Sequence, residues 1–576
     1  MGKEIDTVSL FAKYIVSNNH SGSDYFALIK ELVALRNRQP AAGSEYVSYQ
    51  AEIDRAYSLV EQEIRENAGL PVTPVKFGTS GWRGILGKDI FVKSVGQVTL
   101  AIVEMYRDLE SGSELAALLG VEDFQEARQR GCVVCFDNRF GGEILAGQVV
   151  DVLTSNGIVV HYAGEATTGT LSASVLELKA AFSINLTPSH NPLEYGGFKF
   201  NAADAGPAAA VITNQIMENV GQIMANDRLP DRRPDPSLIR KHDALAAWTS
   251  LVRANIGQHG LDYDGIIDAF ARADNLVVAV DCVHGASRIH VRPFFKEVQS
   301  DRLLVLRGNP DPTFGGIAPE PSSKNMEPVV KALRARNEPL KLGVVIDPDG
   351  DRIRFTDGTN EINMNKFGVL AYHYLHEIKK KKGLVAKTVA TSNFANAVAE
   401  ALHEEVFEPR VGFKEFKPVI GRALVLFEES DGISIIGHTP EKDAYIGLLL
   451  ALDMVLSQQK NLGEYLREIE EIYGKYCPGV SSVSVSRQGE ELQETLGALE
   501  RYGVGSELEI AGTKRRIVKV IDIDGRKMIF DNNSWILIRP SGTEPKVRFY
   551  VEARSEAEEG ALLETARQML VEAGLL

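Results

Sequence analysis

The sequence predicts an α/β protein of several domains, and three observations support this. Short apolar runs such as "CVVCFDNRF", "GIVVHYAG" and "AAFSINL" alternate with helix-like segments, which is typical of sheets flanked by helices. At 576 residues the chain is too long for one hydrophobic core, so we expect about three to five domains. A polar, proline-rich stretch at about 222–245 interrupts the alternation, and it predicts a domain boundary.

Composition and charge narrow the class of partner. Hydrophobic residues make up 44% of the chain and charged residues 24%, as in ordinary soluble globular proteins. The net charge of −15 argues against nucleic acid or an anionic membrane as the main partner. The N-terminus has no signal-like region, and no run approaches the roughly 18 apolar residues of a membrane span. We therefore expect a cytoplasmic protein, in which a local basic pocket for a small anion is still compatible with the net charge.

Cys132 and Cys135 form a C-x-x-C pattern, which invites a redox or zinc interpretation. They lie within the apolar run "CVVCF", where residues three apart on a strand point to opposite faces. No second cysteine pair follows at zinc spacing. The pattern therefore favours buried free thiols.

The first 70 residues have helical apolar spacing, as in "YFALIKELVALRNR". They predict a helical extension packed on a first domain at 71–222. That domain opens with a glycine-rich loop at 77–84 that carries Arg83, and such a backbone can approach a ligand closely. A plain surface turn is the alternative.

An apolar run ends at Thr187-Pro188-Ser189-His190-Asn191-Pro192. This predicts a buried strand that leads into a rigid, exposed loop, with the Ser189 hydroxyl held at the mouth of a cleft. A hydroxyl that carries a transferred group needs such placement and a neighbouring base or charge. An ordinary proline-bounded turn is the alternative.

The second predicted domain, 240–357, contains the strand "LKLGVVI", which runs directly into Asp347, Asp349, Asp351 and Arg352. Three carboxylates at alternate positions can converge on one hard cation, and Mg²⁺ prefers oxygen ligands. An EF-hand is excluded, because its sixth and twelfth positions hold Arg352 and Gly358. Repulsion among the carboxylates is unfavourable without a cation, so the turn predicts a metal site.

Two further clusters point to a sugar phosphate. In the predicted third domain, 358–468, the turn Glu428–Gly432 offers hydrogen-bond acceptors and the Ser430 hydroxyl, which suit a polyhydroxylated ligand. A generic acidic turn is the alternative. In the predicted fourth domain, 469–576, the chain places an arginine, two hydroxyls and a glycine together, which is a good phosphate cradle. The residues of this second cluster are Arg539, Ser541, Gly542, Thr543 and Arg548.

These signals, in this order, resemble the α-D-phosphohexomutase superfamily of phosphoglucomutases and phosphomannomutases. The resemblance covers about residues 72–576, and the "TPSHNP" and "GGFKFN" segments are most similar to the bacterial phosphoglucomutases. It implies a four-domain, heart-shaped protein, with three mixed-sheet α/β domains and a smaller α+β domain around a central cleft.

The resemblance also implies a role for each candidate residue. Ser189 is implied as the phosphorylated serine, which shares Mg²⁺ with Asp347, Asp349 and Asp351. Arg83, His190 and Lys199 match positions of proton transfer and charge stabilisation. Lys199 is either a base with a lowered pKa or a partner for phosphate charge. The implied substrate contacts are Arg352 beside the metal, Lys414, Glu428, Ser430, Arg539, Ser541, Gly542, Thr543 and Arg548.

The implied activity interconverts glucose 1-phosphate and glucose 6-phosphate through a phosphoserine enzyme, with one Mg²⁺ per subunit and glucose 1,6-bisphosphate as activator and intermediate. A phosphomannomutase or a phosphopentomutase with the same mechanism is the alternative. An aspartyl phosphatase and a non-catalytic sugar-phosphate binding protein are the other classes. Phe427 and Asp431 stand where the family's sugar loop more usually has glycine, so the choice of sugar stays open, as does monomer or dimer.

Overall fold

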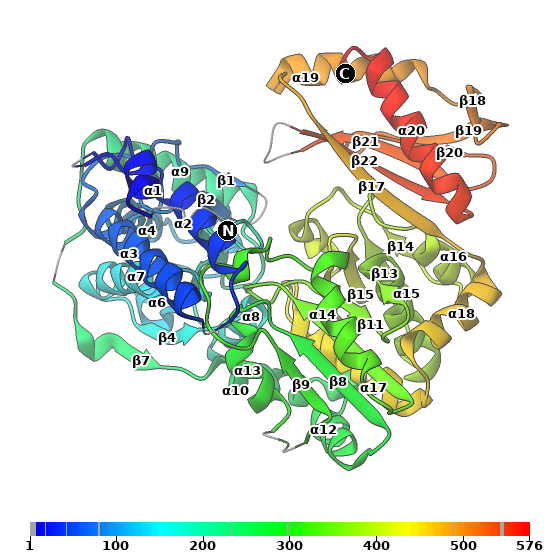
Figure 1. Ribbon diagram of the computed structural model, residues 1–576, viewed down its shortest axis with the longest axis horizontal. Helices are drawn as coiled ribbons and strands as arrows, with labels where there is room; N and C mark the ends of the chain where they lie inside the picture. The colour runs from blue at the N-terminus through cyan, green and yellow to red at the C-terminus, as the bar shows by residue number, and fades with distance from the viewer. Residues whose placement is uncertain are drawn as a thin grey trace.

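The computed structural model describes residues 7–17, 19–41, 43–78, 81–231, 233–296, 298, 300–487, 489–541 and 546–576. Within these residues four β-sheets follow one another along the chain, each with its own set of helices (Figure 1). The first sheet and the N-terminal helices lie at one end, and the fourth sheet stands on the third domain (Figure 1). The predicted four-domain α/β architecture is confirmed.

The N-terminal extension consists of three helices, α1 (Thr7–Tyr14), α2 (Tyr25–Arg36) and α3 (Ser44–Glu66). Apolar side chains at helical spacing, among them Leu32, Val60 and Ile64, are buried in the core of the first domain. The Asp24 side chain caps α2 by accepting the Ala27 N–H at 3.0 Å. The extension therefore packs on the first domain.

The first sheet is mixed, with the strand order β1-β2-β6-β5-β3-β4-β7. Strands β5, β3, β4 and β7 run parallel, and β6, β2 and β1 continue the sheet in antiparallel pairs. The strands are β1 (Phe77–Gly78), β2 (Gly81–Ile85), β3 (Cys132–Phe136), β4 (Val160–Glu165), β5 (Phe182–Leu186), β6 (Tyr195–Ala202) and β7 (Ile239–Lys241). The helices are α4 (Val92–Arg107), α5 (Glu114–Leu119), α6 (Phe124–Arg130), α7 (Gly142–Ser155), α8 (Thr168–Leu178) and α9 (Ala210–Ala225).

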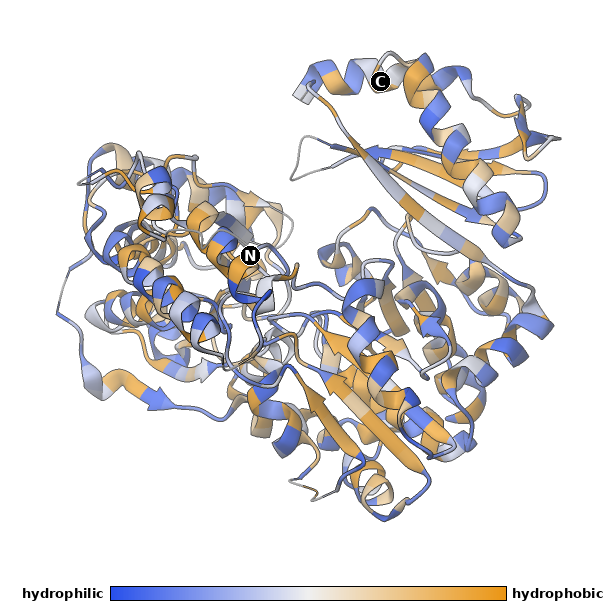
Figure 2. Cartoon of the chain, in the orientation of Figure 1, coloured by the Kyte–Doolittle hydropathy of each residue, from blue (hydrophilic) through white to orange (hydrophobic). Residues whose placement is uncertain are grey.

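The second sheet has the order β12-β11-β10-β8-β9, and its central strands β10 and β8 are parallel. Figure 2 shows these strands as continuous apolar ribbons, as expected of strands covered on both faces. The strands are β8 (Leu276–Asp281), β9 (Leu303–Leu306), β10 (Leu340–Ile346), β11 (Ile353–Thr356) and β12 (Glu361–Ile362). The helices are η1 (Pro236–Leu238), α10 (Ala244–Ala254), α11 (Ile256–His259), α12 (Tyr263–Arg272), α13 (Ser287–Phe294), η2 (Phe314–Gly316) and α14 (Ser323–Arg334).

The third sheet, β14-β13-β15-β16, shares one hydrophobic core with the second, so the two domains form one packed unit. Its strands are β13 (Leu384–Lys387), β14 (Val406–Phe407), β15 (Ala423–Glu428) and β16 (Gly432–Ile435). Its helices are α15 (Met364–His373), η3 (Tyr374–Ile378), α16 (Phe394–Ala401), η4 (Phe413–Val419), α17 (Ala444–Gln458) and α18 (Leu462–Tyr473).

The fourth sheet is antiparallel, in the order β17-β22-β21-β20-β19-β18, and has its own core. Helix α20 (Glu556–Glu572) covers one of its faces (Figure 1). The strands are β17 (Cys477–Ser484), β18 (Glu507–Ile510), β19 (Thr513–Ile521), β20 (Arg526–Phe530), β21 (Trp535–Pro540) and β22 (Lys546–Ala553). The remaining helices are α19 (Gly489–Gly497) and η5 (Ala498–Arg501).

Two domain boundaries differ from the expected bounds. Strand β7 comes after the proline-rich stretch, yet it pairs with β4 of the first sheet, so that sheet reaches the expected start of the second domain at 240. Helix α18 runs to Tyr473 and packs against α15, α16 and α17, so the third domain continues past 468. Both boundaries depend on contacts with segments that are distant in the sequence: the pairing of β7 with β4 and the packing of α18 on the third domain. Local composition carries no information about such contacts.

The four cysteines are free and buried, as predicted for Cys132 and Cys135. Cys132 and Cys135 belong to core clusters on opposite sides of the first sheet. No helix in the described part of the chain is both long and apolar enough to cross a membrane.

Candidate active site

Ser189 lies at the end of β5 in the loop that follows Thr187 and Pro188. Its backbone is left-handed, with φ +59°, which is costly for a residue with a side chain. The Ser189 N–H donates to Thr187 Oγ1 at 2.8 Å, and Thr187 Oγ1 donates to Asp137 Oδ2 at 2.7 Å. These bonds fix the direction of the Ser189 side chain.

Ser189 is not exposed as the sequence predicted, because it is only 1% accessible to solvent, whereas Pro192 at the end of the loop is exposed. The aspartate turn of the second domain covers it, and Ser189 Oγ lies 3.2 Å from Asp347 Oδ2. The expectation that Ser189 is exposed was wrong, since an apolar strand followed by prolines carries no information about a second domain.

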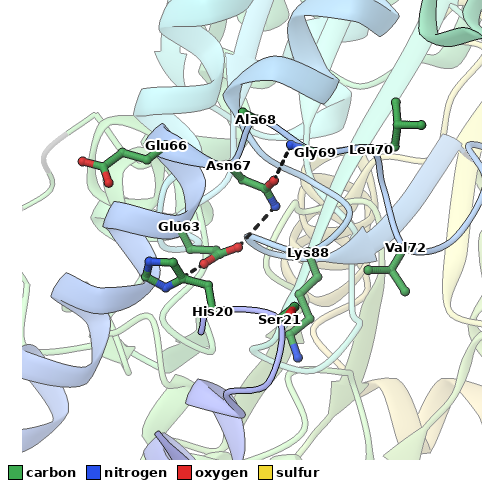
Figure 3. Close-up of a pocket in the computed structure, with 10 residues that line it drawn as sticks. All are labelled: His20, Ser21, Glu63, Glu66, Asn67, Ala68, Gly69, Leu70, Val72 and Lys88. Atoms are coloured by element: carbon green, nitrogen blue, oxygen red, sulfur yellow. Dashed lines mark hydrogen bonds and ion pairs between the residues drawn. The ribbon is translucent and has the colours of Figure 1, made fainter. Parts of the chain in front are cut away.

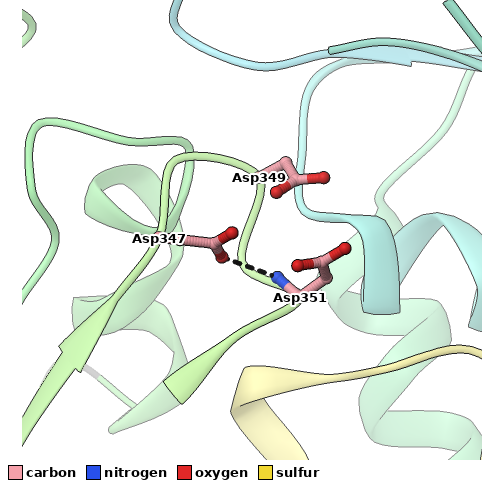
Figure 4. Close-up of side chains that lie close together, drawn as sticks. All are labelled: Asp347, Asp349 and Asp351. Atoms are coloured by element: carbon pink, nitrogen blue, oxygen red, sulfur yellow. Dashed lines mark hydrogen bonds between the residues drawn. The ribbon is translucent and has the colours of Figure 1, made fainter. Parts of the chain in front are cut away.

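The aspartate turn follows β10 directly. Asp347, Asp349 and Asp351 are all buried, and an oxygen from each lies within 4.8 Å of the others (Figure 4). Asp347 Oδ1 accepts the N–H groups of Asp351 and Arg352, both at 3.0 Å. Gly350 has φ +65°, and a Cβ there would approach Thr167 Cγ2 to 2.6 Å. The turn is therefore shaped so that the three carboxylates face one point.

The residues present fit a divalent cation. Asp349 Oδ1 and Asp351 Oδ1 are buried and accept no hydrogen bond, which is costly for charged oxygens. Burial, together with the carboxylates of Asp351 and Asp349, raises the pKa of Asp347 well above its usual range. A bound Mg²⁺ would be ligated by these oxygens and would supply positive charge next to Ser189 Oγ.

Lys199 on β6 also reaches the aspartate turn. Its Nζ lies 2.6 Å from Asp349 Oδ2 and 3.1 Å from Asp351 Oδ2. Burial alone would lower the pKa of Lys199, but the two carboxylates outweigh it and raise the pKa. The lowered pKa expected for a base is therefore not found in this arrangement. Lys199 is an ammonium ion held close to the Ser189 loop.

Lys442 is a second buried lysine at this centre, and our sequence predictions missed it. Its Nζ lies 3.5 Å from Asp351 Oδ2 and 3.7 Å from Glu441 Oε1. Gly432 makes room for it, because a Cβ there would come within 2.2 Å of Lys442 Cδ. The only local signal is a charged "EKD" triplet, and such triplets are common on exposed loops.

Arg83 and His190 flank the same loop. Arg83 lies on β2, opposite Gly197 of β6, and donates to Asn191 Oδ1 at 2.7 Å. His190 Nδ1 lies 3.6 Å from Glu320 Oε2, a second-domain residue that our sequence predictions missed. Burial, and then the charge of Arg352, lowers the pKa of His190 to about 4. His190 is therefore neutral near pH 7 and can accept a proton.

Glu428, Ser430 and Arg352 lie close to the metal turn. Strands β15 and β16 form a hairpin with Ser430 at its tip, and Arg352 bridges to Gly432. Glu428 is buried and accepts the Gly412 N–H at 2.9 Å. Burial raises the pKa of its carboxyl to about 7. Lys414 lies near this hairpin, on η4, which packs against β15.

Two departures from the family's sugar loop are compensated by neighbours. The carboxylate of Asp431 lies 2.6 Å from the Arg354 guanidinium, so its extra charge is paired. Phe427 packs over Gly368 of α15, where a Cβ would approach the ring to 2.3 Å. Both features hold the hairpin in place.

The predicted phosphate cradle is described only in part. Arg539 on β21 is paired in register with Arg548 on β22, and Ser541 follows β21. Gly542 and Thr543 lie outside the described residues. Arg539 Nε lies 3.1 Å from Asp524 Oδ2, which also accepts the Val411 N–H at 3.0 Å. Arg539 therefore lies where the fourth domain meets the third.

Comparison with known families decides the class of protein. Models described as phosphoglucomutase/phosphomannomutase, alpha/beta/alpha domains I, II and III, match residues 74–227, 263–360 and 363–473, and the C-terminal domain model matches 484–568. The chain belongs to this phosphoglucomutase/phosphomannomutase family. Membership confirms the predicted enzyme class, an intramolecular phosphotransferase of the mutase type.

Three relatives illustrate the range of names within this family. The Thermococcus kodakarensis "Phosphoglucomutase/phosphomannomutase" is 26% identical, over 86% of this chain and 98% of the relative. A "Probable phosphoglucosamine mutase" of Methanosarcina acetivorans is also 26% identical, over 86% and 99%. The solved putative phosphomannomutase of Thermus thermophilus is 26% identical, covers 87% of this chain and 99% of its own, and has a TM-score of 0.68. These names agree on sugar-phosphate mutases but not on the sugar.

A cavity of about 560 Å³ lies apart from this centre, between the extension and the first domain (Figure 3). Glu63 at its edge lies 2.8 Å from His20 Nδ1 and accepts from Asn67 Nδ2 at 3.2 Å. None of the described candidate site residues lines it.

Proposed function

We propose that the chain interconverts glucose 1-phosphate and glucose 6-phosphate, with Ser189 as the phosphoryl carrier. The observation that carries this proposal is the contact of Ser189 Oγ with Asp347 Oδ2 at 3.2 Å, at the centre of a buried cluster of three carboxylates and a lysine. Phosphoryl transfer depends mainly on positioning and charge neutralisation. A hydroxyl held beside a cation site and an ammonium group meets both needs.

In the proposed half-reaction, phosphoserine 189 faces the free 6-hydroxyl of glucose 1-phosphate. The bond from phosphorus to Ser189 Oγ breaks, and a bond from phosphorus to the sugar oxygen forms. The proton of the sugar hydroxyl is lost and Ser189 Oγ gains one, which neutral His190 can relay. The product, glucose 1,6-bisphosphate, then turns over and returns its 1-phosphoryl group to Ser189, leaving glucose 6-phosphate.

The charged residues divide the remaining work. Lys199 and Arg83 stabilise the negative charge on the transferring group, as an ammonium and a guanidinium fixed on adjacent strands. Asp347, Asp349 and Asp351 would hold one Mg²⁺, which would supply positive charge next to the phosphoryl group on Ser189. Arg352 would lie beside that ion, since its backbone N–H donates to Asp347 Oδ1.

The other three loops hold the substrate in this proposal. Glu428 accepts hydrogen bonds from the sugar hydroxyls, and the Ser430 hydroxyl can donate or accept them. Lys414 contacts the substrate from the third domain. The phosphate that does not react binds the fourth domain through Arg539, Ser541, Gly542, Thr543 and Arg548.

The relatives favour one further candidate, a glucosamine phosphate, because several are named probable phosphoglucosamine mutases. Mannose and pentose phosphates remain the alternatives within the same mechanism. A purified sample with Mg²⁺ and a trace of glucose 1,6-bisphosphate should turn over glucose 1-phosphate with the highest kcat/KM among the glucose, mannose, glucosamine and ribose 1-phosphates. EDTA should abolish this activity. A clear preference for another sugar phosphate would make that sugar the substrate in place of glucose. No turnover of any of the four sugar phosphates would refute the proposal.

A further inference from the structure

The N-terminal extension contacts the second domain as well as the first. The segment Asn309–Ile317 of the second domain packs against it. Asn37 Nδ2 donates to the Gly315 carbonyl at 2.8 Å, and the Tyr57 hydroxyl donates to the Pro312 carbonyl at 3.3 Å. The buried Arg36 guanidinium lies 3.5 Å from Thr313 Oγ1. The segment therefore rests on helices α2 and α3.

Phe314, in the middle of this segment, is fully buried among side chains of the extension and the first domain. Its backbone is left-handed, with φ +51°, which is unfavourable for an aromatic residue unless its surroundings impose it. Its ring lies under the guanidinium of Arg139, 4.9 Å from the centroid to Cζ, within the range of a cation–π contact. The second domain thus reaches into the first and supports one arginine.

Arg139 in turn holds the backbone of the Ser189 loop. Its guanidinium donates to the carbonyls of Ser189 and Pro192, both at 2.7 Å, and also to the carbonyl of Asn191. Arg139 is itself buried, with Asp137 Oδ2 3.4 Å from its Nε. One planar group thus fixes the carbonyl of the serine and two carbonyls that follow it, which a lysine ammonium cannot match in geometry.

We propose that the N-terminal extension is a clamp that positions Ser189 through Asn309–Ile317, Phe314 and Arg139. The family match begins only at residue 74, so the extension is an addition to the matched domains. The proposal rests on the proposed role of Ser189 as phosphoryl carrier. Arg139 is a positioning residue, because its hydrogen bonds are to the loop backbone.

Two further contacts support the clamp. Lys30 of α2 lies 2.7 Å from Glu194 Oε1, just beyond the Ser189 loop. The chain that leaves the clamped segment reaches Glu320, which faces His190 at 3.6 Å. Both contacts lie on the C-terminal side of Ser189, and the Lys30 contact comes directly from the extension.

The clamp predicts a defined kinetic defect. A misplacement of about 1 Å at the reacting group can cost roughly 100-fold in rate, whereas the sugar and its distant phosphate bind elsewhere. Loosening the clamp should therefore lower kcat at least tenfold and leave KM for the sugar phosphate within about twofold. If the extension had only a structural role, the same variants would lower the melting temperature without a loss of kcat at unchanged KM.

The test uses the full chain and hydrogen exchange measured by mass spectrometry. Asn37→Ala combined with Tyr57→Phe removes two hydrogen bonds to the segment and keeps most of the packing. Phe314→Leu removes the ring and keeps an apolar side chain. Arg65→Ala, on an exposed position of α3, is the matched control. Backbone amides between Thr187 and Tyr195 should exchange at least fivefold faster in both test variants and at the wild-type rate in the control.

Unchanged exchange of the Ser189 loop in the two test variants would overturn the clamp, whatever the activity shows. If wild-type protein proves to have no mutase activity, the exchange measurement still decides whether the extension holds the loop, so the two proposals fail separately. Phe314→Tyr keeps the aromatic face and should restore slow exchange if the variant folds. Fast exchange in Phe314→Tyr equal to that in Phe314→Leu would refute the role of the ring.

Discussion

The Ser189 hydroxyl and the Asp347 carboxylate are 158 residues apart in the chain and lie 3.2 Å apart in space. Each comes from the end of a parallel strand in a different domain, where α/β sheets place their ligands. Ser189 contributes a hydroxyl on a left-handed backbone, and Asp347 belongs to a carboxylate cluster whose charge is only partly paired.

Magnesium should stabilise the protein through the aspartate turn. An ion at a hundredfold its dissociation constant adds about 2.7 kcal/mol to the free energy of unfolding. Asp347→Asn keeps the oxygen that accepts two N–H groups and removes one negative charge. It should raise the melting temperature of the metal-free protein at pH 8 and abolish most of the shift caused by Mg²⁺. Asp268→Asn, at an exposed position, should keep the full shift, and a full shift in Asp347→Asn would place the ion elsewhere.

Stability should depend on pH through Glu428. Its pKa is about 7 in the folded protein and 4.5 for an ordinary glutamate. Between these pH values the folded state keeps a proton on Glu428 that the unfolded state has lost. The free energy of unfolding therefore falls as pH rises from about 4.5 through 7. Removing the ionisation with Glu428→Gln should stabilise the protein at pH 8 by up to roughly 3 kcal/mol and change little at pH 4.5.

Urea unfolding of wild type and Glu428→Gln at the two pH values measures this difference. The exposed Glu405→Gln is the control, and its difference from wild type should not vary with pH. Equal effects of Glu428→Gln at both pH values would show that the carboxyl is already ionised throughout.

The Arg354–Asp431 pair should stabilise the sugar-loop hairpin. Removing Arg354 leaves the buried Asp431 carboxylate without this partner, which costs about 3–5 kcal/mol in buried pairs. Removing Asp431 costs less, because Arg354 still lies 3.0 Å from Glu361 Oε1. Asp431→Asn and Arg354→Leu should each destabilise the protein, and the double variant should lose clearly less than the sum. A double-mutant cycle by thermal unfolding should give a coupling of about 1–3 kcal/mol. Additive losses would mean that Asp431 is not neutralised by Arg354.

Gly197 should tolerate no side chain. A Cβ at this position on β6 would come within 2.2 Å of the Thr187 carbonyl oxygen, so Gly197→Ala must push the Ser189 loop away from Lys199. We expect at least a 100-fold loss of kcat. Gly221→Ala, in helix α9 with open space around the position, should be neutral or stabilising by about 0.5–1 kcal/mol. Wild-type activity in Gly197→Ala would show that the loop does not need this fit.

Local sequence patterns predicted the loops of this site but not the way they meet. The apolar strand before Asp347 and the alternation of its carboxylates marked that turn as a metal site. Nothing local to Ser189 shows that Asp347 covers it, and nothing local to Lys442 or Glu320 separates them from surface residues. Those assignments depend on contacts between domains. The boundary at 240 was misjudged for the same reason, because β7 is defined by its pairing with β4.

The most direct test of the central claim is the covalent state of Ser189. Wild-type protein treated with phosphatase and then with glucose 1,6-bisphosphate and Mg²⁺ should gain the mass of one phosphoryl group, located at Ser189 by peptide mapping. Addition of glucose 1-phosphate should remove that group, and Ser189→Ala should neither gain it nor turn over substrate. A phosphoryl group found on an aspartate, or full turnover by Ser189→Ala, would contradict the account.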